Sequence, residues 1–281
     1  MNKDTDDITY GVVGWPVKQS LSPEIHNHWI VQQGIKECYG LLEIEPKDLK
    51  EKIERLVATG LKGFNVTVPH KVAIMAELDA IDEIAKAVGA VNTVMVGEDG
   101  KLSGTNTDVY GFLHNLKLKA PNWCADKPAL VLGAGGAARA AAYGLLQAGV
   151  PKIYITNRTL SKAEDLSREL DSNILTSIPW ESRESVIGDV CLIVNTTTLG
   201  MAGCAELELD LTSAQKQTVI YDIVYKPLMT NLLLDAEARG LNAVTGFGML
   251  VHQAAAAFNV WFGQYPDLND GFIDELEGRF K

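Results

Sequence analysis

Hydrophobic and polar positions along this chain fall into blocks that predict strands followed by helices. Short apolar runs that end at glycine, proline or asparagine are typical of buried strands, and the amphipathic or alanine-rich stretches between them are typical of helices. The expected strands are residues 8–14, 38–44, 63–68, 129–133, 151–157, 189–195, 218–224 and 242–245. The expected helices are residues 23–34, 46–59, 109–119, 137–149, 160–170, 229–239 and 249–263, with helical segments between 71 and 88, and Asp99-Gly100 predicts a hairpin at 96–104. This alternation predicts an α/β fold.

The order of these elements predicts two domains, which suits a chain of 281 residues. A loop at residues 121–128 precedes a second run of strands and helices. The helix expected at 249–263 follows that run, but it is too apolar to be a tail, so we expect it to return to the first domain. The first domain is therefore predicted to comprise residues 1–108 and 249–281, and the second to comprise residues 109–248.

A glycine-rich turn begins the second domain, in the stretch ALVLGAGGAAR at residues 129–139. An apolar strand leads into Gly133, Gly135 and Gly136, and an alanine-rich helix follows. The backbone N–H groups and the dipole at such a helix N-terminus favour a pyrophosphate. Glycines also mark ordinary tight turns, but this strand–turn–helix context indicates a dinucleotide site.

The next expected strand ends at Asn157-Arg158-Thr159, where an NAD site would offer an acid to the ribose. Here no acid occurs before Glu164, and Lys162 adds a second cation. A guanidinium pairs with a 2′-phosphate, which a carboxylate would repel. An isolated arginine is more often a solvated surface charge, but at this position after the glycine turn it predicts NADP as the cofactor.

Polar side chains also gather near the end of the strand at 63–68. Asn65 and Thr67 share one face of that strand, and Lys71 follows its end. Because open α/β sheets bind ligands at the carboxyl ends of their strands, these side chains stand where a substrate would bind. The pattern alone is equally compatible with a polar edge strand and a surface lysine.

Two further candidates have an alternative structural interpretation. Ser22 directly precedes Pro23, which is typical of a helix N-cap followed by proline in the first turn. Asp108 precedes the helix expected at 109–119 and could cap it in the same way.

Composition narrows the classes of partner. The net charge of −11 argues against nucleic acid or an anionic membrane as the main partner. The four cysteines lack CxxC spacing and the five histidines lack metal-ligand spacing, so we expect reduced thiols, a cytoplasmic protein and no metal site. The polar N-terminus is unlike a signal peptide, and no apolar run reaches membrane-spanning length. The composition is compatible with a monomer or a homodimer.

Taken together, the motifs resemble those of the shikimate dehydrogenase family. In chain order they are SLSP at 20–23, NVTVPHK at 65–71, GAVNT at 89–93, GTNTDVYG at 104–111, GAGGAARA at 133–140, NRT at 157–159, NTTTLGM at 195–201, DIVYKPLMTNLL at 222–233 and GFGMLVHQA at 246–254. They cover residues 8 to 265 in the family's order. The chain departs from the family at Gln19, where many members have histidine, and at Lys162, where arginine is frequent.

The resemblance implies an N-terminal α/β substrate domain, a Rossmann-like NADP domain and a closing helix that returns to the first domain. It implies NADPH-dependent reduction of 3-dehydroshikimate to shikimate, a step toward chorismate and the aromatic amino acids, with Lys71 and Asp108 as the catalytic pair. It also implies three groups of binding residues: Ser20, Ser22 and Tyr225 for the substrate carboxylate; Thr67, Asn92, Asp108 and Gln253 for its hydroxyls, supported by Asn65; and Gly133, Ala134, Gly135, Gly136, Ala137, Asn157, Arg158, Thr159 and Lys162 for NADP, with Glu83, Ile223 and Gly246 bordering the nicotinamide. The alternatives are a quinate/shikimate dehydrogenase of broader specificity and a non-catalytic NADP-binding regulatory protein.

Overall fold

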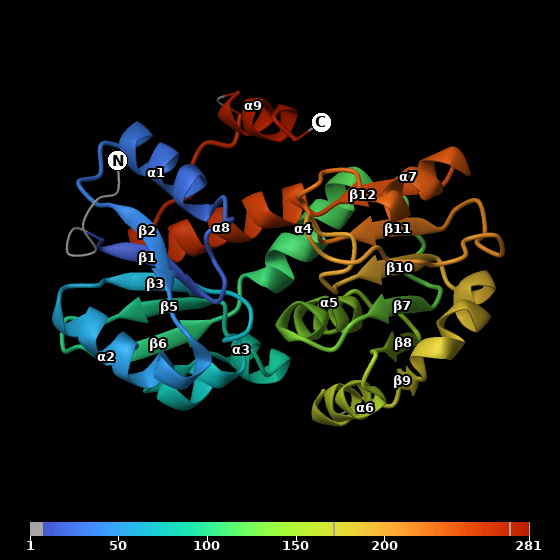
Figure 1. Cartoon of the computed structure of the whole chain (residues 1–281), viewed down its shortest axis with the longest axis horizontal. Coiled ribbons are helices and arrows are strands. Elements are labelled where there is room, and N and C mark those ends of the chain that lie inside the picture. The colour runs from blue at the N-terminus through green and yellow to red at the C-terminus, as the bar shows by residue number, and fades with distance from the viewer. Residues whose placement is uncertain (1–7, 171, 270, 281) are drawn as a thin grey trace. The chain divides into compact units, whose positions relative to one another are not determined.

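The computed structural model describes residues 8–170, 172–269 and 271–280, which form two compact units (Figure 1). Within these ranges, the first unit contains residues 8–107 and 253–269, and the second contains residues 108–252 and 271–280. The sequence predicts the C-terminal tail in the first domain, but residues 271–280 group with the second unit. Lys226 Nζ lies 5.9 Å from the centroid of the Phe280 ring, one contact between the tail and this unit. Residues 1–7, 171, 270 and 281 of the predicted domains lie outside the described residues.

The first unit is built on a mixed six-stranded sheet, in the order β2-β1-β3-β5-β6-β4. Its strands are β1 (Tyr10–Gly14), β2 (Tyr39–Glu43), β3 (Gly63–Val66), β4 (Ala80–Ile81), β5 (Thr93–Val96) and β6 (Leu102–Thr105). β1 pairs in parallel with β2 and β3, whereas β5 runs antiparallel to β3 and β6. The β5–β6 pair is the predicted hairpin, and Gly100 in its turn has a φ of 78°, which favours glycine.

The helices of the first unit differ from prediction at one place. They are α1 (Ser22–Gln32), α2 (Leu49–Ala58), α3 (Glu83–Val88) and the 3₁₀ helices Pro46–Asp48 and Ala73–Glu77. The helical segments predicted between residues 71 and 88 are the 3₁₀ helix Ala73–Glu77 and α3, and the unpredicted strand β4 lies between them. The Asp79 N–H donates to Leu102 O over 2.9 Å and its Oδ2 accepts from the Leu102 N–H over 2.8 Å, which ties this segment to β6. Asp82 then caps α3 by accepting from the Ala85 N–H.

The second unit contains a parallel six-stranded sheet, in the order β12-β11-β10-β7-β8-β9. The strands are β7 (Ala129–Leu132), β8 (Ile153–Thr156), β9 (Leu175–Ile178), β10 (Leu192–Asn195), β11 (Val219–Asp222) and β12 (Asn242–Thr245). The chain moves outward from β7 in both directions, first through β8 and β9 and later through β10 to β12. The glycine turn follows β7, so it lies at the point where the strand order reverses, which is the usual ligand position in such sheets.

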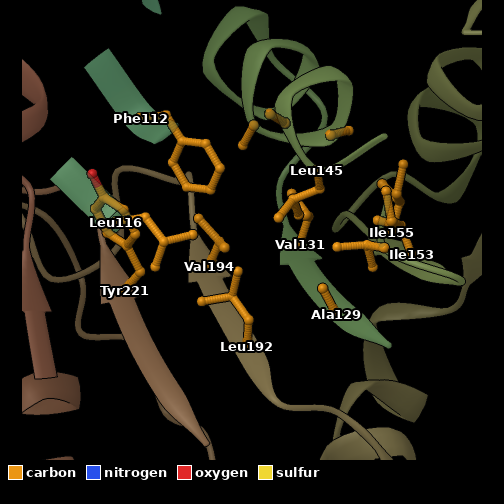
Figure 2. Packing of buried hydrophobic residues seen from close by; sticks show 14 of the residues in the cluster. Phe112, Leu116, Ala129, Val131, Leu145, Ile153, Ile155, Leu192, Val194 and Tyr221 are labelled. Carbon is orange, nitrogen blue, oxygen red and sulfur yellow. The ribbon is translucent and has the colours of Figure 1, made fainter. Parts of the chain in front are cut away.

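Apolar side chains cover both faces of this second sheet. The helices of the second unit are α4 (Asp108–Lys119), α5 (Gly136–Gln147), α6 (Leu160–Glu169), α7 (Asn231–Ala238), the first residues of α8 (Phe247–Phe262) and α9 (Phe272–Gly278), with a 3₁₀ segment at Trp180–Asp189. Val131 and Ile153 pack with Phe112 and Leu145 on one face, as Figure 2 shows. Leu130, and the strand residues whose side chains point the same way, pack on the opposite face of the sheet. Burial of both faces explains why these strands read as continuous apolar runs.

Candidate active site

In the first unit, polar side chains from four separate segments meet in one buried hydrogen-bonded cluster. Asn92 donates through Nδ2 to Thr107 Oγ1 over 2.9 Å and to Gln253 Oε1 over 3.3 Å. Asn65 donates through Nδ2 to Thr93 Oγ1 over 3.1 Å, and the Thr93 hydroxyl donates to Asn92 Oδ1 over 3.0 Å. Residues far apart in the sequence therefore converge, and the predicted candidates Asn65, Asn92 and Gln253 are brought together.

Ser20 and Ser22 lie at the start of α1. Ser22 is the first residue of the helix, while Leu21 occupies the N-cap position without a side-chain cap. The interpretation of Ser22 as a helix cap is therefore wrong. Ser20 Oγ donates to Ser22 Oγ over 3.1 Å and accepts from the Ser22 N–H over 3.2 Å, so the two side chains form a pair.

Thr67 and Lys71 follow β3 and are both half-buried. The Thr67 N–H donates to Val13 O over 2.8 Å, and a Cβ on Gly14 would lie 2.5 Å from Thr67 Cγ2, so Thr67 packs closely against β1. Lys71 lies in a turn rather than in the predicted helix. Its carbonyl accepts from the Val91 N–H over 2.8 Å, which fixes the turn at the backbone.

The remaining substrate and catalytic candidates belong to the second unit. Asp108 is the first residue of α4 and only 3% exposed. Tyr225 is half-buried in the segment after β11. Glu83 belongs instead to the first unit, where its exposed side chain pairs with Lys86 over 3.1 Å.

The glycine turn after β7 has the backbone that the sequence predicts. Gly133 has a φ of 115°, and a Cβ there would lie 2.5 Å from Thr196 Oγ1, so both conformation and space require glycine. Gly135 is the N-cap of α5, and a Cβ there would meet no atom within 4 Å. Ala134, Gly136 and Ala137 are partly exposed. Ala138 is fully buried, as expected for close packing of α5 on the sheet.

The loop after β8 presents its two cations to solvent. Asn157 Nδ2 donates to Thr159 O over 2.9 Å, and the Lys162 N–H donates to the same carbonyl over 3.1 Å, so the backbone of this loop is fixed. The Arg158 and Lys162 side chains are exposed. Within the described part of the chain, neither cation forms an ion pair with a carboxylate.

A buried acid that the sequence analysis did not identify lies at the ends of β10 and β11. Asp222 Oδ1 accepts from Asn195 Nδ2 over 2.9 Å and from the Val224 N–H over 3.0 Å, and its Oδ2 accepts from Thr230 Oγ1 over 2.7 Å. Burial raises the pKa of Asp222 to about 6, against the effect of these hydrogen bonds. In the sequence, the signal that could have identified Asp222 is an acidic residue at the end of an apolar strand.

Ile223 and Gly246 lie in contact next to this acid. A Cβ on Gly246 would stand 2.1 Å from Ile223 O, so only glycine fits directly before α8. Ile223 is held by its N–H, which donates to Asn195 O over 3.0 Å.

Among the described residues there is neither a candidate metal site nor a helix that could span a membrane. No three His, Cys, Asp or Glu side chains of these residues gather as a metal site would require. No helix in the described ranges combines the length and apolar character needed to cross a membrane.

Comparisons with known proteins cover nearly the whole chain. Residues 12–94 match the model of the shikimate dehydrogenase substrate binding domain, residues 116–224 that of shikimate / quinate 5-dehydrogenase, and residues 246–270 that of the shikimate 5′-dehydrogenase C-terminal domain. A shikimate dehydrogenase (NADP⁺) from Paramagnetospirillum magneticum is 47% identical over 92% of this chain and 94% of its own. One from Rhodospirillum rubrum is 45% identical over 96% of each chain.

Solved structures agree with these relatives. Shikimate 5-dehydrogenase from Thermus thermophilus, crystallised with NADP(H) and shikimate, is 35% identical with a TM-score of 0.83, over 98% of this chain and 100% of that one. Quinate dehydrogenase from Corynebacterium glutamicum, in complex with NAD, is 30% identical with a TM-score of 0.86, over 98% of both chains. Family models, relatives and folds point the same way, and the chain belongs to the shikimate dehydrogenase family.

Proposed function

We propose that this chain catalyses the reversible NADPH-dependent reduction of 3-dehydroshikimate to shikimate, a step toward chorismate and the aromatic amino acids. The observation that carries the proposal is the convergence of Asn65, Asn92, Thr107 and Gln253 in one hydrogen-bonded cluster. A cyclic substrate with several hydroxyls needs such a set of amide and hydroxyl groups.

In this proposal the substrate carboxylate binds the Ser20 and Ser22 hydroxyls and Tyr225. The paired serines support this role, because their two hydroxyls lie together at the start of α1, where they hydrogen-bond each other. The substrate hydroxyls bind Thr67, Asn92, Asp108 and Gln253.

Lys71 and Asp108 are proposed as the acid–base pair. Reduction of a ketone builds negative charge on its oxygen, and a proton donor must stand within hydrogen-bond reach. Lys71 donates that proton from Nζ, and takes it back when shikimate is oxidised. Asp108 orients the lysine and accepts from a substrate hydroxyl; its burial supports a fixed orientation.

The residues of the second unit fit NADP. Gly135 leaves open space at the N-terminus of α5, and the first turn of that helix carries no acid. Arg158 and Lys162 are exposed cations suited to the 2′-phosphate, with Asn157 and Thr159 shaping their loop. The bound cofactor supplies the hydride. The remaining contacts fall to residues Gly133 to Ala137 at the pyrophosphate and to Glu83, Ile223 and Gly246 near the nicotinamide.

The cellular setting is also a proposal. All four cysteines are free thiols, which supports a reducing compartment, the cytoplasm. The net charge of −11 supports a protein that does not act on nucleic acid. A homodimer is compatible with the composition, and the mass of the protein in solution tests it.

The proposed function is tested by following reduced-nicotinamide absorbance with purified protein, shikimate or quinate, and NADP or NAD. We expect strong turnover with shikimate and NADP only. Comparable turnover with quinate or NAD would instead indicate an enzyme of broader specificity. A folded protein that binds NADP without turning over either substrate would indicate a regulatory protein.

A further inference from the structure

We propose that Tyr39, a buried residue of β2, is a positioning residue for the substrate pocket. Its hydroxyl joins the pair of serines, Ser20 and Ser22, to the buried hydrogen-bonded cluster that contains Asn65, Asn92 and Gln253. The proposal rests on the proposed function, since it assigns Tyr39 a role in binding shikimate. It extends that function, because Tyr39 does not itself touch the substrate.

The Tyr39 hydroxyl connects the two groups. It donates to Asn65 Oδ1 over 2.7 Å in a fully buried contact, and the Ser22 side chain interacts with the same hydroxyl. Burial raises the pKa of Tyr39 well above its ordinary range, so the hydroxyl keeps its proton and remains a donor.

The hydrogen bond from Tyr39 fixes which way the Asn65 amide points. With Oδ1 facing Tyr39, Nδ2 donates to Asn92 O over 3.2 Å and to Thr93 Oγ1 over 3.1 Å. Both N–H groups of Asn65 therefore bond within the protein, and they tie Asn65 to Asn92 and Thr93.

The effect continues from Asn65 to the side chains proposed to bind the substrate hydroxyls. The Thr93 hydroxyl donates to Asn92 Oδ1 over 3.0 Å, and the Asn92 amide then donates to Gln253 Oε1 over 3.3 Å. If the Asn65 amide turned over, its oxygen would face Asn92 O and Thr93 Oγ1, and both hydrogen bonds would be lost, leaving the Thr107 N–H, which donates to Asn92 Oδ1 over 2.7 Å, to orient Asn92. The Tyr39 hydroxyl therefore selects one orientation of the Asn65 amide, and through it the bonds from Asn65 to Asn92 and Thr93.

The Tyr39 ring is held by packing that does not depend on its hydroxyl. It stacks on His26 with centroids 4.3 Å apart and planes 8° from parallel, and Trp261 lies 6.0 Å away. Tyr39→Phe keeps this packing and removes only the hydrogen bonds.

Tyr10 offers a matched control. It is the register partner of Tyr39 on the neighbouring strand β1, it is also buried, and its ring lies 5.2 Å from that of Trp261. Tyr10→Phe therefore removes a second phenol hydroxyl, on a ring beside the same tryptophan.

We expect Tyr39→Phe to raise the KM for shikimate about tenfold, because the Asn65 amide loses the buried hydrogen bond that sets its orientation, and to change kcat by less than about threefold. The KM for NADP should stay as in the wild type, and Tyr10→Phe should leave all three values within about twofold. An unchanged shikimate KM in Tyr39→Phe, or an equal rise in Tyr10→Phe, would overturn the proposal. If Tyr39→Phe does not fold, Thr93→Val breaks the same chain of hydrogen bonds and should give the same rise in KM.

A second readout separates this proposal from the proposed function. In the protein without substrate, NMR signals of the Asn65 and Asn92 side-chain amides should shift in Tyr39→Phe and stay in place in Tyr10→Phe. If the wild-type protein did not turn over shikimate, the proposed function would fail while these amide shifts still decided whether Tyr39 orders the cluster. Unmoved amide signals in Tyr39→Phe would overturn the positioning role whatever the turnover.

Discussion

Asn195 donates a hydrogen bond from Nδ2 to Asp222 Oδ1 over 2.9 Å, which joins the carboxyl ends of the neighbouring strands β10 and β11. The loops after both strands depend on this contact, since Asn195 Oδ1 also accepts from the Thr197 N–H and Asp222 accepts from the Val224 N–H. The same pair thus shapes the ends of two strands next to the glycine turn.

Asp222 makes the stability of the protein depend on pH in an unusual direction. Its pKa is about 6 in the folded protein, against 3.8 for an ordinary Asp, so the folded state holds a proton that the unfolded state has released between pH 4 and 6. The stabilisation that Asp222 gives is complete below pH 4 and is lost as the pH rises to 6, by about 3 kcal/mol. Asp222→Asn should not show this loss. Denaturant unfolding at pH 4 and pH 7 tests this, because the stability difference between wild type and variant should change by about 3 kcal/mol between the two pH values.

Thr230→Val provides the check on this interpretation. The Thr230 hydroxyl donates to Asp222 Oδ2 and favours the charged form, so its removal should raise the pKa of Asp222 and move the loss of stability to higher pH. A stability difference between wild type and Asp222→Asn that is the same at pH 4 and pH 7 would contradict the raised pKa.

His26 produces the opposite dependence in the first unit. It is fully buried against Tyr39 and Trp29, and burial lowers its pKa from 6.5 to about 3, against a smaller opposing effect of the Asn65 side chain. The unfolded state therefore gains a proton before the folded state does, and stability is lost as the pH falls below 6.5, by about 2 kcal/mol at pH 5.

His26→Phe should remove this sensitivity to acid. The phenyl ring can keep the stacking on Tyr39 and carries no group that titrates, so we expect stability at pH 7 to change by less than about 1.5 kcal/mol. Thermal melts of both proteins from pH 7 to pH 5 measure the effect. Parallel declines of the two melting temperatures over this range would show that His26 is not the group responsible.

The sequence predicted the parts of the fold whose signals are local. The apolar run into Gly133 marks β7 and its turn, and Asp99-Gly100 marks the hairpin, because each turn demands a particular residue type. β9 was missed because its sequence LTSI is short and partly polar, as an edge strand can be. α9 was missed because a short acidic helix shows no clear periodicity.

Site residues that belong to a sequence motif were predicted, whereas residues that act through distant partners were not. Motifs identified Ser22 and Asn65 as candidates, but the alternative interpretation of Ser22 as a helix cap was wrong, because the Ser22 hydroxyl pairs with that of Ser20. Tyr39 and Asp222 escaped notice because each sits in a strand-like stretch and works through residues distant in the sequence. Such partners are decided by tertiary packing, which no local pattern carries.

The proposed acid–base role of Lys71 predicts a specific kinetic defect. Lys71→Ala should lower kcat at least several hundred-fold, within the roughly 10²–10⁴ range of a lost proton donor, and should change the KM for shikimate little. Lys101→Ala is the control, since Lys101 is an exposed lysine of the same unit that pairs with Asp99 in the hairpin. Steady-state rates at saturating NADP measure both variants. A Lys71→Ala enzyme with near-normal kcat would remove this residue from the mechanism.

Arg158 should decide the choice between NADP and NAD. Its exposed guanidinium follows β8 without a carboxylate partner among the described residues, so it is available to the 2′-phosphate, which only NADP carries. Arg158→Asp replaces attraction by repulsion and should weaken NADPH binding at least tenfold while changing NADH binding little. Arg168→Asp, on the last turn of α6, is the control, since it makes the same charge change at an exposed arginine that pairs with Asp165. Fluorescence titration of both reduced cofactors measures the four affinities, and equal losses for NADPH and NADH in Arg158→Asp would show that this arginine does not read the phosphate.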